Sequence, residues 1–90
     1  MILLTEVFKL NEHATGVQKE FSLREVLVNP EHVFMLREDK KMSERQEKGL
    51  LPLDLDKRQK FTKVYFNTLN HSVISVVGET TLVTNKLRGH

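Results

Sequence analysis

The sequence contains no cysteine among its 90 residues, no tryptophan and only two prolines. Without cysteine the chain has no disulfide framework, no thiolate zinc site and no cysteine nucleophile, which fits a reducing compartment. Its opening residues, Met1 to Glu6, lack the basic segment of a signal peptide. No apolar run approaches the roughly 18 to 20 residues that cross a bilayer. These absences predict a cytoplasmic protein without a membrane partner.

Recognisable catalytic motifs are missing as well. The chain has four glycines, and they form neither a phosphate-cradling loop nor a dinucleotide fingerprint; a serine nucleophile elbow is also absent. None of the four histidines lies in a ligand pair of known spacing. Asp54 and Asp56 would share a face of an extended segment, where a paired-carboxylate or magnesium site can be imagined, but the pattern favours solvated loop charges. We therefore expect no catalytic residue, no metal and no cofactor, and a protein that is not an enzyme.

A chain of this length suits one domain with a single core, residues 1–90. β-branched and aromatic residues predict a mainly β domain, and the clearest pair of strands is a hairpin of residues 61–67 and 72–77. Further strands are predicted at residues 2–8, 17–23 and 32–38, with a polar turn at 11–16 and an ambiguous stretch after Leu23. A small twisted sheet or an SH3-like or Sm-like barrel of about five strands accommodates this pattern.

Two segments leave room for alternatives. The four apolar residues from Val33 to Leu36 predict a central strand that is either buried on both faces or bent tightly around a small barrel. After Gly78, residues 79–87 fit either a short C-terminal helix, with Leu82 and Leu87 on one side, or a last strand. The threonines of this segment favour the strand.

Hydrophobic periodicity fails over residues 39–60, which predicts a long and mobile insertion. Within it, the pattern from Ser43 to Lys48 fits a short helix that Ser43 would cap, with Gln46 at the reciprocal position and Gly49 at the end. The insertion also contains an apolar patch that could bind a partner protein or fold back onto the domain's own core. The candidate partner-binding residues are Leu50, Leu51 and Leu53.

Positive charge is concentrated in residues 40–63, which hold eight basic and four acidic side chains, while the remaining residues carry a net charge of −2. Cations beside aromatic residues on a strand can bind nucleic acid, because cations neutralise phosphates while an exposed ring stacks on a base. The alternative is that Phe61 and Phe66 belong to the core and that the lysines form a solvated face. The candidate nucleic-acid-binding residues are Arg37, Lys57, Arg58, Lys60, Lys63 and Tyr65.

The stretches 1–5, 28–33 and 61–66, with the valine-rich run over residues 73–83, resemble the small FlbD-type flagellar proteins and similar phage-encoded proteins. In that pattern an initial strand leads to an Asn-Pro-like turn, a Thr-x-[Ile/Val] strand and a closing segment that enters a Glu-Thr pair. The resemblance implies a small barrel with a regulatory or accessory role, and it carries over no binding residues. Residues 39–60 are an insertion relative to this pattern.

Met1 to Glu6 and Met35 to Asp39 are also similar to two segments of the carbon-storage regulator family of RNA-binding proteins. That family has an arginine for RNA contact where this chain has Glu6, and it has little sequence beyond the position of Arg37. The similarity therefore implies a role for Arg37 alone.

Together these features predict a small regulatory or accessory interaction protein, phage-encoded if the first resemblance holds, that binds a host or partner macromolecule. Its expected partner is a protein, reached through the basic insertion and a sheet edge. The alternative is a nucleic-acid-binding protein that uses the same basic insertion and the sheet surface. Free edges of a small sheet are also compatible with a homodimer.

Overall fold

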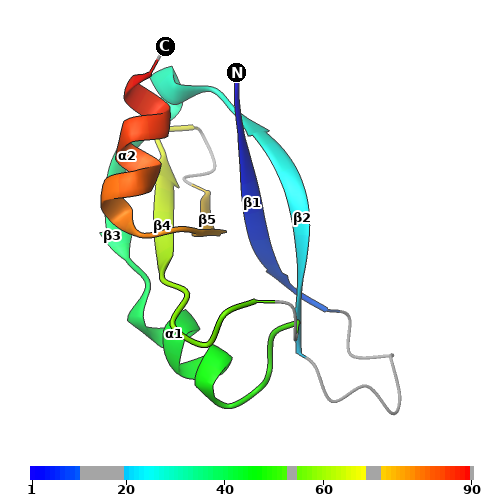
Figure 1. Cartoon of the computed structure of the whole chain (residues 1–90). Helices are drawn as coiled ribbons and strands as arrows, with labels where there is room; N and C mark the ends of the chain where they lie inside the picture. The colour runs from blue at the N-terminus through cyan, green and yellow to red at the C-terminus, as the bar shows by residue number, and fades with distance from the viewer. Residues whose placement is uncertain (11–19, 53–54, 69–71, 90) are drawn as a thin grey trace.

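The computed structural model describes residues 1–10, 20–52, 55–68 and 72–89. This part of the chain forms five strands, two α-helices and one short 3-10 turn (Figure 1). The mainly β prediction is confirmed. The elements are β1 (Ile2–Lys9), β2 (Phe21–Val28), η1 (Pro30–His32), β3 (Val33–Glu38), α1 (Lys40–Glu47), β4 (Phe61–Phe66), β5 (Val73–Val77) and α2 (Thr80–Arg88).

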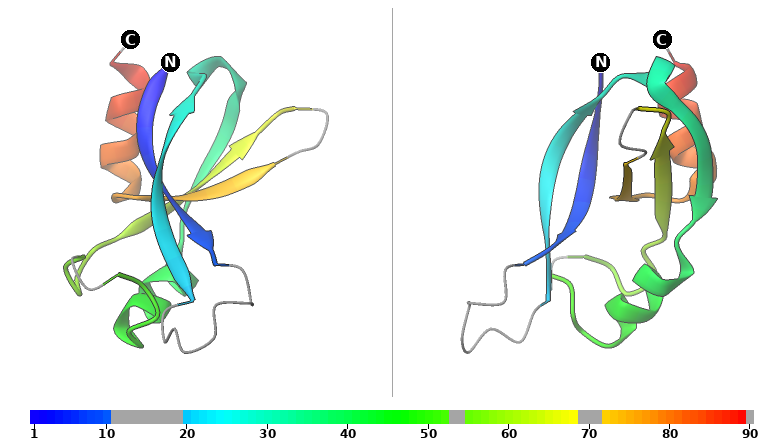
Figure 2. Two further views of the ribbon diagram at one scale, coloured as in Figure 1. Left: turned by 90° about the vertical axis from the view of Figure 1, so that its right-hand side faces the viewer. Right: turned by 180° about the vertical axis from the view of Figure 1, so that it is seen from behind.

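The five strands make one open antiparallel sheet in the order β2-β1-β5-β4-β3. The predicted hairpin of β4 and β5 is present, and its paired residues run from Phe61 opposite Val77 to Tyr65 opposite Val73. The β1–β2 hairpin joins the other three strands through only two residue pairs between β1 and β5. It consequently stands apart from β3 and β4, on the other side of the molecule (Figure 2).

The positions of β2 and β3 differ from the sequence predictions. β2 continues to Val28, because each of its residues from Phe21 onward pairs with a residue of β1. β3 is an edge strand and not the central strand expected from its apolar run. Its pairing with β4 shifts between Val33 and Met35, which leaves Phe34 as an extra, bulged residue with 56% of its surface exposed. The bulge therefore divides an apolar run that looked uniformly buried.

The core consists of two clusters on the two faces of the sheet. The first lies on the face that α2 covers, and its buried members are Ile2, Leu4, Val28, Val64, Val76 and Val83. The second lies under α1 and the chain that follows it, and its buried members are Val7, Phe21, Met42, Leu51 and Phe61. On β1, Ile2 and Leu4 are two residues apart and enter the first cluster, whereas Val7, three residues after Leu4, enters the second, as the two-residue period of a strand requires.

The C-terminal segment is a helix, so the preference for a strand there was wrong. The pairing of β5 with β4 ends at Val77, opposite Phe61, the first residue of β4, and the chain turns out of the sheet at Gly78, whose φ is 122°. α2 then buries Val83 in the first cluster. Burial of this apolar side chain outweighs the strand preference of the threonines, and the Thr84 hydroxyl donates to the Thr80 carbonyl within the helix.

The described residues of the predicted insertion, 39–52 and 55–60, contribute to the core. α1 begins at Lys40 with Asp39 as its N-cap, not at Ser43, because the Asp39 carboxylate accepts a hydrogen bond from the backbone N–H of Met42 at 3.1 Å. The Gln46 side chain donates to two backbone carbonyls of the following loop. Leu51, at 1% exposure, packs in the second cluster. The sequence shows no hydrophobic periodicity here because Leu51 lies in a loop. A loop buries single residues without a repeating pattern.

Candidate binding surface

The structure divides the six predicted nucleic-acid-binding residues into two groups. Arg37, Lys63 and Tyr65 lie on the face of the sheet opposite the first core cluster, on β3 and β4. Lys57, Arg58 and Lys60 lie in the loop before β4, at the opposite end of that strand. Tyr65 is half-buried. Because the two groups lie at opposite ends of β4, they do not form one site.

The cations of the first group face each other across the two strands. Arg37 and Lys63 are directly opposite in the β3–β4 register, and like charges in this position repel each other. Neither forms an ion pair within the described ranges of the chain. Lys63 has Ser75 of β5 as its other neighbour in the register, and Ser75 carries no charge. Two positive charges thus lie side by side on the sheet, and Ser75, in register with Lys63, donates its hydroxyl to the buried Asp39 carboxylate.

An aromatic pair lies beside these cations. The next outward pair along the strands is Met35 opposite Tyr65, and the bulged Phe34 brings its ring to 6.3 Å from the Tyr65 ring, with an angle of 59° between the planes. Such tilted pairs stabilise both rings. The exposed face of Phe34 remains available to a ligand. We name these five residues the β3–β4 patch: Phe34, Met35, Arg37, Lys63 and Tyr65.

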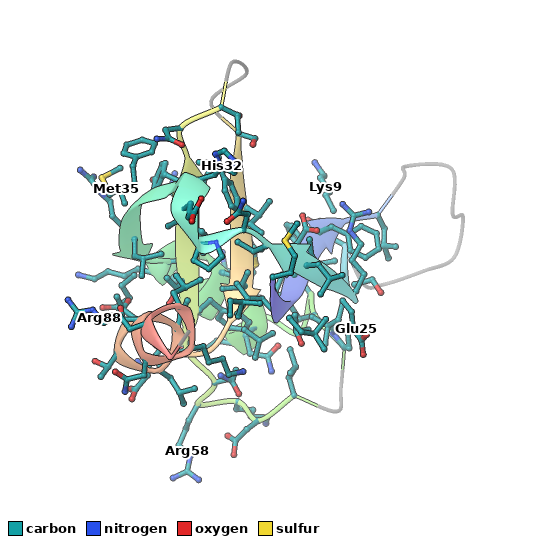
Figure 3. All side chains as sticks on the ribbon, turned by 90° about the horizontal axis from the view of Figure 1, so that it is seen from above. Lys9, Glu25, His32, Met35, Arg58 and Arg88 are labelled. Atoms are coloured by element: carbon teal, nitrogen blue, oxygen red, sulfur yellow. The ribbon has the colours of Figure 1, made fainter. Side chains whose placement is uncertain are left out.

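A shallow hollow of about 310 Å³ extends the patch from β3 toward α2. Leu36 and Leu87 form part of its apolar floor, and Phe34 and Arg88 are also among its lining residues. Arg88 points outward on the same side of the molecule as Met35, while Arg58 points away from both (Figure 3). The sequence analysis did not select Phe34 or Arg88. Phe34 is exposed because of the bulge, and Arg88 lies at the hollow because of the way α2 packs, and neither feature is visible in the sequence.

The loop cations have acidic neighbours. The Arg58 guanidinium lies 3.6 Å from the Asp56 carboxylate, and the backbone N–H of Arg58 donates to the same oxygen at 2.8 Å. A second hollow, of about 350 Å³, is lined by Arg58 and Lys60 but also by Asp56 and Glu79. These carboxylates offset part of the positive charge of the loop.

Two other arginines are held by contacts within the domain, which sets them apart from Arg37. Arg24 Nε donates to Glu6 at 2.9 Å across the β1–β2 ladder, and this hydrogen bond raises the pKa of Arg24. Its guanidinium carbon also lies 4.3 Å from the centre of the Phe8 ring. Arg45 lies in the same way 4.9 Å from the Phe21 ring. These cations stabilise the domain's own surface.

The apolar candidates of the loop are mostly used by the domain itself. Leu51 is buried in the second cluster, as the folding-back alternative proposed, and Leu50 is half-buried against it. The backbone carbonyl of Leu50 accepts hydrogen bonds from the N–H groups of Glu20 and Phe21. Leu53 lies outside the described residues. The two leucines that the structure describes in this segment therefore offer little free apolar surface to a partner.

The described residues contain no group of three or more histidine or acidic side chains that could hold a metal ion. Asp56 is engaged by Arg58, and its suggested companion Asp54 lies outside the described residues. Within the same ranges, no helix is long and apolar enough to cross a membrane.

No family model, no curated protein and no solved structure matches this chain. The resemblances to FlbD-type proteins and to the carbon-storage regulators therefore stay predictions from short motifs.

Proposed function

We propose that this protein is a non-catalytic interaction domain that binds a partner macromolecule through the β3–β4 patch. The single observation behind the proposal is Phe34, which is 56% exposed although Phe61 and Phe21 are buried in the same domain. A large exposed ring beside Tyr65, Met35 and Arg37 has the composition of binding hot spots, which are rich in aromatic residues, methionine and arginine.

The proposal keeps the regulatory or accessory role that the sequence resemblance implies, including a phage origin and a cytoplasmic location. It narrows the binding surface. The expected surface was the basic insertion together with a sheet edge; the β3–β4 patch keeps an edge strand, β3, and leaves out the insertion, whose Arg58 has an acidic neighbour and whose Leu51 is buried. Deleting residues 44–56 would remove Gln46 and Leu51 from the folded domain, so point substitutions in the β3–β4 patch are the better test.

The test compares Phe34→Thr with Leu82→Ala, because both wild-type residues are large, apolar and about half exposed, and Leu82 lies on α2 outside the patch. Tagged wild-type and variant domains are incubated with a cell lysate, and the retained proteins and nucleic acids are quantified. We expect Phe34→Thr to lose the retained partner and Leu82→Ala to keep it. Equal retention by all three proteins would contradict the proposal.

A further inference from the structure

We propose that the partner bound at the β3–β4 patch is a single-stranded nucleic acid, an inference that rests on the binding role proposed above. The first step is the stacking surface. Phe34 exposes more than half of its surface, and the centre of its ring lies 6.3 Å from the centre of the Tyr65 ring. Bases stack on such rings with little dependence on sequence, and each stacked base contributes about 1–3 kcal/mol. The aromatic pair is therefore a platform for an unpaired base.

The second step is the position of the cations. Arg37 and Lys63 lie one outward pair further along the strands than Met35 and Tyr65, a separation of about 7 Å. A nucleotide whose base covers Phe34 would bring its phosphate within reach of these two side chains. Because Arg37 and Lys63 oppose each other without an ion pair in the described structure, a phosphate would also relieve their repulsion.

A third cation continues the surface on the other side of the ring. Arg88 lies at the end of α2, exposed, and lines the same hollow as Phe34. Arg88 lies on the side of β3 that α2 covers, whereas the Arg37–Lys63 pair lies on the opposite face of the sheet. A backbone that passes over the Phe34 ring and turns around the edge of the sheet at β3 would meet positive charge on both sides of that edge.

The geometry of β3 argues against a peptide strand as the occupant. An added peptide strand needs a regular row of backbone donors and acceptors along the sheet edge. The bulge at Phe34 interrupts that row, and such bulges are a common protection against edge pairing. A duplex is also disfavoured, because its bases are stacked inside and cannot cover an exposed ring.

The test measures binding of fluorescein-labelled 12-nucleotide oligo-U and oligo-dT, and of a 12-base-pair DNA duplex, by anisotropy at about 50 and 200 mM salt. We expect both single strands to bind more tightly than the duplex. We expect Phe34→Thr to weaken their binding about 10-fold or more, and Leu82→Ala to leave it unchanged.

A matched pair of double variants tests the cations. Arg37→Gln with Lys63→Gln and Lys57→Gln with Arg58→Gln remove the same charge from the patch and from the loop. The patch variant should weaken binding and reduce the slope of log affinity against log salt by about 1.4, the value for two lost phosphate contacts. The loop variant should change neither quantity by a comparable amount. Thermal unfolding of each variant establishes that it is folded.

Three outcomes would overturn the inference. One is equal effects of the two double variants, and another is a preference for the duplex. The third is the absence of oligonucleotide binding at the lower salt. In that case, if capture of a partner from a nuclease-treated lysate still depended on Phe34, the partner would be a protein and the proposed function would stand. If neither oligonucleotides nor lysate partners depended on Phe34, both proposals would fail.

Discussion

At the scale of single residues, Asp39 connects three elements. It is 2% exposed, and one carboxylate oxygen caps α1 through the N–H of Met42 while the other accepts a hydrogen bond from the Ser75 hydroxyl on β5. Its own N–H donates to the carbonyl of Phe61 at 2.9 Å. The negative charge also lies at the positive end of the α1 dipole. One side chain thus fixes the helix to the sheet.

Asp39→Ala should lower the free energy of unfolding by roughly 2–4 kcal/mol, because it removes the cap and leaves the Ser75 hydroxyl without its acceptor. Asp39→Asn should cost less, since the amide oxygen can still cap Met42 and the amide nitrogen can donate to Ser75. Urea unfolding followed by circular dichroism measures both values. Equal stability of the alanine variant and the wild type would show that these hydrogen bonds contribute nothing net.

At the scale of elements, the chain after α1 acts as a lid over the second core cluster. Leu51 is its deepest residue, and Leu50 lies beside it with part of its surface in solvent. The carbonyl of Leu50 ties this chain to the start of β2. The lid replaces a second helix or a further strand as the cover of Phe21 and Phe61.

Leu51→Ala should therefore destabilise the domain by about 2–5 kcal/mol, the range for a fully buried leucine. Leu50→Ala should cost about 1 kcal/mol, because only part of its surface is buried and its backbone hydrogen bonds persist. Urea midpoints of the two variants provide the measurement. A loss at Leu51 no larger than the loss at Leu50 would indicate that the lid is open in solution.

At the scale of the whole molecule, the first core cluster joins two groups of strands. The β1–β2 hairpin meets β5 in only two residue pairs, yet the first cluster takes Leu4 and Val28 from the hairpin and Val64 and Val76 from the other group. Apolar contact across the first cluster, more than the short ladder, joins the two groups. α2 reinforces this contact by placing Val83 in the same cluster.

The domain should consequently unfold in one cooperative step. Circular dichroism reports all strands, while fluorescence of Tyr65, the only tyrosine in a chain without tryptophan, reports β4. We expect the two urea transitions to coincide, with a slope of about 1 kcal/mol per molar. Separate transitions would mean that the β1–β2 hairpin unfolds independently.

The sequence by itself determined the local features of this protein. The alternation and turn residues of the β4–β5 hairpin predicted its strands closely, and the first strand was also found, because short-range periodicity and turn chemistry encode such elements. Three of the proposed site residues were already candidates from the sequence: Lys63 and Tyr65 through their residue types, and Arg37 through the similarity to the carbon-storage regulators. The sequence did not show that these residues are separated from Lys57, Arg58 and Lys60, because the separation depends on which end of β4 each residue occupies.

Only the tertiary structure decided the rest. Whether β3 is central or at an edge depends on which strands pair with it, and its bulge at Phe34 follows from the register with β4. α2 is helical because a helix after Gly78 buries Val83 in the first core cluster. Strand order, register and burial come from contacts between residues far apart in the chain, and no local pattern contains them.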